Sequence, residues 1–216
     1  MQKFENLFLE YMNEVCEDHP DPSHDILHVQ RVVALAKKLA KIEGANLEVV
    51  LPAAYLHDCV YVSKADARRS QASRLSAQRA IELLRHWQYP ERHFDEIAHA
   101  IESHSFSAAV SPQTIEAKVV QDADRLDAMG AVGVFRCFAF SGLARRPLYF
   151  TDDPFCKERV PDDSTNTLDH FFVKLLRLQD KLNTPAAKLL GERRVVLMQT
   201  FLAQLESEVL DVEVDS

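Results

Sequence analysis

An apolar run that ends in a histidine and an aspartate is the feature that most constrains this chain. Residues 49–56 are all apolar or aromatic, and His57 and Asp58 follow them directly. Because an uncompensated carboxylate is costly to bury, a fold that buries this run must give Asp58 a partner. Imidazole nitrogen and carboxylate oxygen can together ligate one metal ion, but two ligands do not complete a site. The pair therefore predicts that further ligands come from elsewhere in the chain.

Hydrophobic periodicity and composition predict an all-α protein. The chain has 216 residues, of which 47% are hydrophobic and five are glycine. Apolar residues recur at helical spacing from Phe4 to Val15 and again from Val29 to Ala40. Asn46 is expected to cap a third helix, in which Pro52 marks an early turn or a kink. That helix would deliver His57 and the aspartate that follows it.

The C-terminal third contains two expected helices and a long irregular stretch. We expect one helix over about 167–182 and another from Thr184, with Pro185 in its first turn. The stretch from Arg145 to Asp163 holds three prolines, and a loop of this length is either a mobile cover over a pocket or a plain surface excursion. No repeat, low-complexity tract or linker divides the chain, so we expect one domain over 1–216.

Charge and cysteine content exclude several classes of protein. The net charge of −8 argues against nucleic-acid binding, for which a basic domain is usual. The four cysteines include no CxxC pair, which argues against a disulfide framework and a structural zinc site. The N-terminus lacks the pattern of a signal peptide, and no uncharged apolar run approaches the ~20 residues that span a bilayer. We expect a cytoplasmic protein without a nucleic-acid or membrane partner.

Two other places in the chain offer metal ligands. His28 and Asp124 both lie in stretches rich in ionisable residues, and with His57 and Asp58 they make a set of two imidazoles and two carboxylates. Such a set suits a divalent ion such as Mn²⁺, Mg²⁺, Ni²⁺ or Fe²⁺. Six-coordinate geometry would leave positions for a water and a phosphate oxygen, and metal-bound water is a hydroxide source near neutral pH. The alternative is that each histidine makes an ordinary polar contact.

Four blocks of the sequence resemble the HD-domain metal-dependent phosphohydrolases. HDILHVQRV over 24–32 precedes the His57-Asp58 pair, and later blocks read DADRLDAMGAVG over 122–133 and HFFVKL over 170–175. In this order the blocks cover about residues 20–205 and are most similar to uncharacterised bacterial hydrolases of the YedJ type. The resemblance implies a single-domain helical bundle with a central metal site. Its HD core would span about 20–130, followed by C-terminal helices and a long loop over about 131–212.

The resemblance also implies a function. Carried over by position, His28, His57, Asp58 and Asp124 are metal ligands, Asp58 is catalytic, and the reaction is hydrolysis of a phosphate ester or anhydride, often of a nucleotide. A non-catalytic nucleotide or metal sensor with the same fold is the alternative. Val62 stands where a nucleotide-monophosphatase branch has glutamate, and the cyclic-dinucleotide phosphodiesterase signature is missing, so neither narrower activity is assigned.

Several further residues are candidates for binding the substrate. Arg31 lies one helical turn after His28, and Lys64 lies in a polar stretch that either binds phosphate or is simply solvated. His104 matches a recurrent histidine of the family and could contact substrate or a second metal ion. Lys174 belongs to the last block and could face the pocket or the solvent. Asp25 is either a helix cap or a proton-transfer group.

Overall fold

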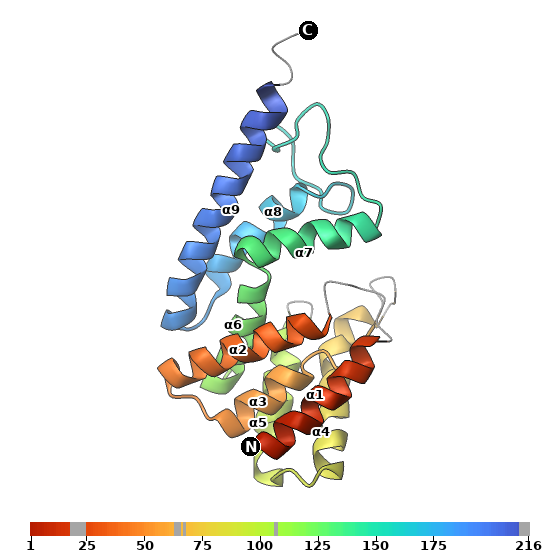
Figure 1. Ribbon diagram of the computed structural model, residues 1–216, viewed down its shortest axis with the longest axis vertical. Coiled ribbons are helices and arrows are strands. Elements are labelled where there is room, and N and C mark those ends of the chain that lie inside the picture. The colour runs from red at the N-terminus through yellow and green to blue at the C-terminus, as the bar shows by residue number, and fades with distance from the viewer. Residues whose placement is uncertain (18–24, 63–65, 67, 106–107, 212–216) are drawn as a thin grey trace. The chain divides into compact units, whose positions relative to one another are not determined.

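All regular structure in the described part of the chain is helical (Figure 1). The all-α prediction is therefore confirmed. The computed structural model describes residues 1–17, 25–62, 66, 68–105 and 108–211.

The chain divides into two compact units. Unit 1 comprises Met1–Asp124 and Asn183–Ala187, and unit 2 comprises Arg125–Leu182 and Lys188–Ser216. The single domain expected over 1–216 stays a prediction. Helices with most of their residues in unit 1 are α1 (Gln2–Glu17), α2 (Ile26–Glu43), α3 (Leu47–Leu56), α4 (Ala72–His86), α5 (Phe94–His104) and α6 (Ile115–Asp127). Those with most of their residues in unit 2 are α7 (Gly130–Leu143), α8 (Asp169–Val173) and α9 (Pro185–Asp211).

The core of unit 1 is built around α3. This helix packs against α1, α2, α4 and α5, and every residue from Val49 to Leu56 is buried. A helix that is apolar on all sides is stable only inside the protein, which explains its central place. Pro52 cannot donate a hydrogen bond to the Glu48 carbonyl, and the Tyr89 hydroxyl donates to that oxygen at 2.6 Å instead. The proline is thus accommodated, and α3 carries His57 into the interior.

Local sequence sets both ends of α2. The Asp25 carboxylate accepts a hydrogen bond from the His28 backbone N–H at 2.8 Å, so Asp25 is the N-cap. At the other end Gly44 adopts a left-handed conformation with φ 73°, and the Ala45 N–H donates to the Ala40 carbonyl at 3.0 Å. A capping carboxylate and a glycine thus define the two ends of the helix. The N-cap also fixes His28 in the first turn of the helix.

A buried carboxylate on α6 joins that helix to the start of α9. Asp122 is 0% exposed and accepts four hydrogen bonds of 2.8 Å, from the backbone N–H and side chain of Asn183 and of Thr184. The Thr184 hydroxyl in turn accepts a hydrogen bond from the Ala187 N–H at 3.3 Å, in the first turn of α9. Four donors compensate the cost of burying this charge. Asp122 therefore stabilises the junction between α6 and α9.

Glycines shape the start of α7 in unit 2. Gly130 has φ +70°, and a Cβ atom there would lie 3.0 Å from the Arg194 side chain. A Cβ atom on Gly133 would lie 2.3 Å from the Ala128 carbonyl oxygen, which is too close for any side chain. Both glycines of the DADRLDAMGAVG block are therefore required by backbone conformation and packing.

The irregular segment 144–168 is held by two aspartates. The Asp153 carboxylate accepts hydrogen bonds of 2.9–3.0 Å from the backbone N–H groups of residues 157–159. Asp169, which is fully buried, binds both terminal nitrogens of Arg159 at 2.6 and 2.7 Å and the Asp162 N–H at 2.6 Å. Asp153 and the backbone of Asp162 thus take part in the internal structure of the segment. That the segment covers a pocket stays a prediction.

One expected helix is wrong in detail. The single helix predicted over about 167–182 is instead the short α8 followed by a 3₁₀ helix over Leu175–Lys181, with Lys174 at the break in an irregular conformation (φ −130°, ψ −60°). Leu175 and Leu178 are buried, and the tighter 3₁₀ winding places residues three apart on one side. Burial of these leucines therefore prevails over the propensity for a continuous α-helix.

No single helix among the described residues is long and apolar enough to cross a bilayer. Helices α6 and α7 meet the length and composition criteria together, but only as a bent pair with a break between them. The cytoplasmic location expected from the sequence stays a prediction.

The first prediction tests the Asp122 junction. Asp122→Asn replaces one acceptor oxygen by an NH₂ group that faces two donors, so we expect a loss of roughly 2–4 kcal/mol in the free energy of unfolding. Asp152→Asn, at an exposed aspartate, should change it by less than about 0.5 kcal/mol. Urea unfolding followed by circular dichroism measures both. Equal stability of the two variants would contradict the proposed role of the junction.

The second prediction concerns pH and the segment 144–168. Burial opposes ionisation of Asp169, yet the hydrogen bonds from Arg159 and the Asp162 N–H hold the pKa of this carboxyl below its ordinary value. A depressed folded-state pKa adds stability above the unfolded-state pKa of about 3.9, and this stability is lost as the pH falls. The wild type should therefore exceed Asp169→Asn in stability by a constant amount above about pH 5, with the difference shrinking below about pH 4. Urea unfolding of both proteins at pH values from 7 to about 3 measures this difference in the free energy of unfolding. A difference that stays constant over the whole range would contradict the prediction.

Candidate metal centre

The C-terminal end of α3 presents an imidazole with one nitrogen already fixed. His57 is fully buried, and its Nδ1 lies 2.9 Å from the Ala54 carbonyl oxygen. Because a carbonyl only accepts, Nδ1 carries the proton and Nε2 has a lone pair. Within the described residues, the buried Nε2 makes no hydrogen bond. An acceptor buried in this way is costly unless something binds to it.

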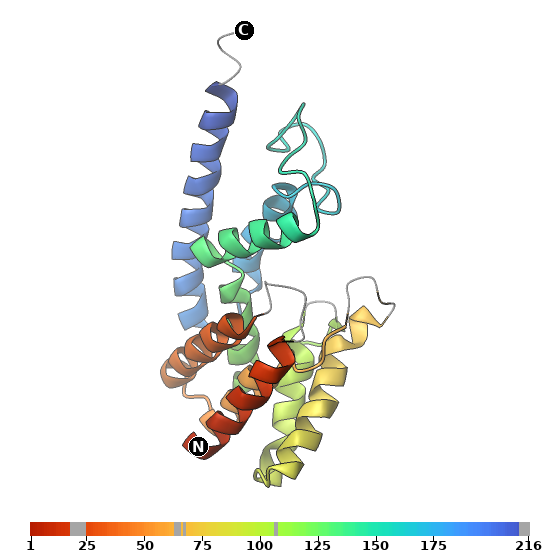
Figure 2. The ribbon, with the colours of Figure 1, turned by 45° about the vertical axis from the view of Figure 1, so that its right-hand side comes forward.

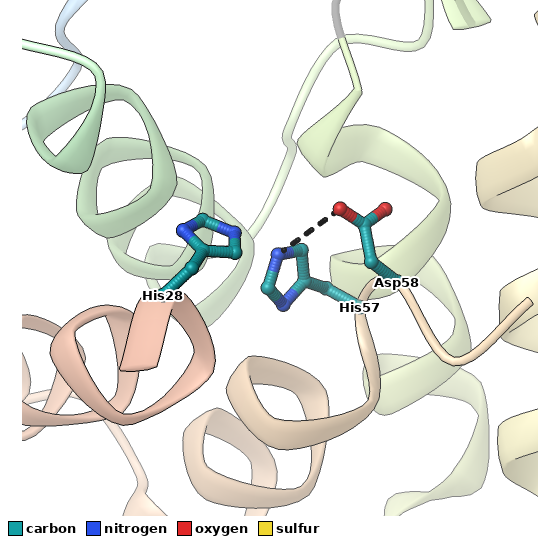
Figure 3. A group of neighbouring side chains, drawn as sticks. All are labelled: His28, His57 and Asp58. Atoms are coloured by element: carbon teal, nitrogen blue, oxygen red, sulfur yellow. Dashed lines mark ion pairs between the residues drawn. The ribbon is translucent and has the colours of Figure 1, made fainter. Parts of the chain in front are cut away.

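A second imidazole comes from the first turn of α2. His28 is 1% exposed, and its ring lies edge-on to that of His57, with the ring centroids 5.4 Å apart. The Nε2 atom of His28 lies 3.7 Å from Asp124 Oδ1. Figure 3 shows the two rings side by side, with Asp58 on the far side of His57. Burial of α2 against α3 brings the two histidines together from positions 29 residues apart in the sequence.

Two carboxylates approach the same imidazole nitrogens. Asp58 Oδ2 lies 3.5 Å and Asp124 Oδ1 lies 3.9 Å from His57 Nε2. These distances are too long for good hydrogen bonds. Ligands about 2.0–2.3 Å from a shared ion, at tetrahedral or octahedral angles, would lie about 3–4 Å apart. The donor spacing therefore fits a divalent ion held between the side chains.

The ligand atoms of three residues form a compact group. His28, His57 and Asp58 each offer one ligand atom, and these atoms lie within 4.8 Å of one another, so the group could hold a metal ion. Asp124 is not part of this group, but its Oδ1 lies 3.7 Å from His28 Nε2 and 3.9 Å from His57 Nε2, and its role as a fourth ligand stays a prediction. Nitrogen and carboxylate oxygen ligands together suit a divalent metal ion, as the sequence predicts.

A third imidazole flanks the other side of Asp58. His104, at the end of α5, is 6% exposed, and its Nδ1 donates to the Ile101 carbonyl oxygen at 2.6 Å. Its Nε2 lies 3.4 Å from Asp58 Oδ1. Burial lowers the pKa of His104, but the hydrogen bond and negative charge of Asp58, together with the charge of Asp124, raise it above the usual value overall. Asp58 thus lies between His57 and His104.

The histidines also act on Asp124. Burial would raise the pKa of this carboxyl, but the neighbouring His57, His28 and His104 together hold it below its ordinary value. The centre therefore favours the ionised carboxylate, which is the form that ligates a metal ion.

The remaining candidates fall in different places. Arg31 is half-buried on α2, one turn beyond His28. Lys64 lies outside the described residues, and Lys174 is an exposed residue of unit 2. Of the two roles left open for Asp25, the structure shows the helix cap. The proposed ligands and His104 are brought together, whereas the substrate-binding roles of the other candidates stay predictions.

Sequence reasoning missed a residue that supports the centre. Gln121 is 3% exposed, donates to the Ser103 carbonyl oxygen at 2.6 Å, and accepts from the Asn183 side chain at 2.8 Å. Ser103 precedes His104, and Gln121 lies three residues before Asp124, so this side chain ties together two helices that carry residues of the centre. The sequence shows only a glutamine directly before the DAD motif, and its burial is a property of the structure.

Comparison with known proteins identifies the family. The HD-domain family model matches residues 26–129. The uncharacterised protein YpgQ of Bacillus subtilis is 36% identical over 197 residues, which are 89% of this chain and 88% of YpgQ. The chain belongs to the HD-domain family. This confirms the resemblance seen in the sequence blocks.

Solved structures of other HD-domain proteins share the fold. A crystal structure of Bacillus subtilis YpgQ in complex with ADP matches with a TM-score of 0.75 at 35% identity, covering 96% of this chain and 95% of that one. An HD-superfamily hydrolase from Bacillus thuringiensis matches with a TM-score of 0.73 at 31% identity, covering 96% and 97%. The predicted HD-domain fold is thus confirmed over almost the whole chain.

The third prediction tests the metal centre without reference to activity. We expect isothermal titration with Mn²⁺ to show one ion per chain. His57→Ala should weaken binding by at least about 100-fold, because even residues that only support metal ligands cost 10–100-fold when changed. His86→Ala, at an exposed histidine of α4, is the matched control and should bind as the wild type does. Equal affinity in both variants, with helical content retained, would exclude His57 as a ligand.

Proposed function

We propose that this protein is a metal-dependent phosphohydrolase that cleaves a phosphate ester or anhydride of a nucleotide or a related small phosphorylated metabolite. The observation that carries the proposal is the buried His57 Nε2, which has two carboxylates within 3.9 Å. In a core, such a nitrogen is readily explained by a metal ion. Membership of a family that includes HD-superfamily hydrolases supports a hydrolytic role.

The nature of the substrate is proposed by analogy. YpgQ of Bacillus subtilis has been crystallised with ADP, and it matches almost the whole of this chain. A nucleotide carries both a phosphate for the metal centre and a base for specificity. Arg31, His104, Lys174 and Lys64 are our candidates for contacts with the substrate, as expected from the sequence.

In this proposal His28, His57, Asp58 and Asp124 hold one divalent ion. When bound, such an ion polarises a phosphoryl oxygen and lowers the pKa of water, which eases attack on phosphorus. The Ala54 carbonyl fixes the tautomer and orientation of His57, as supporting groups of metal-bound histidines do. Hydrolysis forms a bond from water oxygen to phosphorus and breaks the bond from phosphorus to the leaving oxygen.

We assign to the Asp58 carboxylate the role of accepting the proton of the attacking water. This carboxylate lies between the imidazoles of His57 and His104, so its orientation is fixed on both sides. Asp25, the other candidate, already accepts a hydrogen bond from the His28 backbone as the cap of α2. A positively charged side chain near the phosphate would neutralise charge as it develops.

The fourth prediction tests the proposed activity. We expect the wild type to release phosphate or pyrophosphate from at least one member of a panel of nucleoside mono-, di- and triphosphates, with Mn²⁺, Mg²⁺, Ni²⁺ or Co²⁺ added separately. Asp58→Ala should reduce kcat by at least about 1,000-fold, because it removes a metal ligand and the proton acceptor together. Asp152→Asn should retain full activity, and circular dichroism should show that both variants are folded.

Two outcomes would count against the proposal. Wild-type kcat in Asp58→Ala with excess Mn²⁺ would exclude the role assigned to Asp58. Tight nucleotide binding by calorimetry, without turnover under any metal condition, would instead favour the non-catalytic sensor with the same fold.

A further inference from the structure

Asp58 differs from the other proposed ligands in how its main chain is held. His28 lies in α2 and Asp124 lies in α6, while His57 is the C-cap of α3 in a helical conformation. Asp58 comes one residue after that cap, where the helix has ended. The direction of its side chain therefore depends on the irregular segment that follows it, residues 59–62.

A single buried serine of α4 holds the start of this segment. Ser76 is 0% exposed, and its hydroxyl oxygen accepts a hydrogen bond from the Val60 backbone N–H at 3.2 Å. The Ser76 carbonyl oxygen accepts another from the Cys59 thiol at 3.4 Å. Ser76 thus contacts the two residues that directly follow Asp58, one through its side chain and one through its main chain.

The far end of segment 59–62 is joined to the same part of the chain. Arg69 Nη1 donates a hydrogen bond to the carbonyl oxygen of Val62, a residue that is 4% exposed. Arg69 begins the short 3₁₀ helix Arg69–Gln71, which leads directly into α4. Figure 2 shows α4 (yellow) alongside α5, the helix that ends at His104. The segment after Asp58 is therefore attached to an element that is itself packed against another part of the centre.

The need for a hydrogen-bond acceptor explains a serine at position 76. An irregular segment has no helical partners for its N–H groups, so partners must come from elsewhere. The buried face of α4 is otherwise mostly apolar, and a hydroxyl there is costly unless it is hydrogen-bonded. Ser73 lies three residues earlier on this face and is 2% exposed, but within the described residues its Oγ makes no hydrogen bond. Of these two buried serines, Ser76 is the one whose hydroxyl contacts segment 59–62.

We propose that Ser76 is a positioning residue that holds the Asp58 carboxylate in place at the metal centre. This inference rests on the proposed function, in which Asp58 ligates the ion and accepts the proton of the attacking water. The Asp58 carboxylate lies 3.5 Å from His57 Nε2 and 3.4 Å from His104 Nε2, so a rotation of its main chain would move it relative to both. A ligand that is already ordered loses less conformational freedom when the ion binds.

The first experiment measures Mn²⁺ affinity by isothermal titration of the full chain, which requires no substrate. Ser76→Ala should raise the Kd for Mn²⁺ by about 10-fold or more, as loss of groups that orient metal ligands does. Ser73→Ala is the matched control, because it removes a hydroxyl from the same buried face of the same helix. It should bind Mn²⁺ as the wild type does, and circular dichroism should show both variants to be folded.

Ser76→Cys is a second variant at the same position. It keeps a side chain there and replaces a good acceptor by a weak one, so it should also weaken Mn²⁺ binding. Wild-type affinity in both Ser76 variants would overturn the proposal, and so would an equal loss in Ser73→Ala and Ser76→Ala.

A double-mutant cycle tests whether Ser76 acts through Asp58. In the Asp58→Ala background, Ser76→Ala should raise the Kd for Mn²⁺ by less than about 2-fold further, because no carboxylate is left to position. A residue that only supports the fold would weaken binding by the same factor with and without Asp58. That result would exclude the positioning role.

Hydrogen exchange separates this inference from the proposed function. Without metal, the Val60 amide should be protected in the wild type and in Ser73→Ala, and should exchange about 10-fold faster in Ser76→Ala. Equal protection in all three proteins would refute the contact on which the inference rests. A wild type that binds no Mn²⁺ would overturn the metal centre and this inference together. Mn²⁺ binding that is equally tight in the wild type and in Ser76→Ala would overturn this inference alone.

Discussion

The burial of His57 is the constraint on which the site depends. Its ring has no exposure to solvent, and the Ala54 carbonyl satisfies only one of its two nitrogens. The second nitrogen faces two partly exposed carboxylates at distances too long for good hydrogen bonds, so the donors are arranged around a common point at the edge of the core. A buried acceptor nitrogen without a partner is costly, and an ion held between it and the carboxylates would compensate it. Membership of the HD-domain family and the environment of this one imidazole therefore both favour a metal centre.

The helices around this imidazole are held by polar groups that make no contact with it. Asp122 uses four hydrogen bonds to fix the start of α9 against α6, the helix that also carries Asp124. Gln121 ties the end of α5 to the same junction. Loss of one member of a buried polar network leaves its partners unpaired, which is costly. Such networks therefore keep these helices in one arrangement. The DAD block thus combines a candidate metal ligand with a structural carboxylate two residues before it.

Much of unit 1 could be predicted because its signals are local. Asp25 caps α2, Gly44 ends it, and Asn46 caps α3, since each acts on the backbone a few residues away. The helix expected over about 167–182 failed because Lys174 has no local signal for a break. Burial of Leu175 and Leu178 favours the tighter winding that follows, and burial is a property of the fold rather than of the segment. Gln121 was missed for the same reason, because its two partners are 18 and 62 residues away.

By itself the sequence determined the helical class, the identity of the candidate ligands and their order along the chain. Residue chemistry and helical periodicity follow directly from the order of the residues, and the HD-family blocks add the expectation of a metal centre. Only the tertiary structure decided which nitrogen of His57 faces the carboxylates, and that His104 flanks Asp58. These features depend on which groups the packing leaves without solvent, and packing joins residues far apart in the sequence.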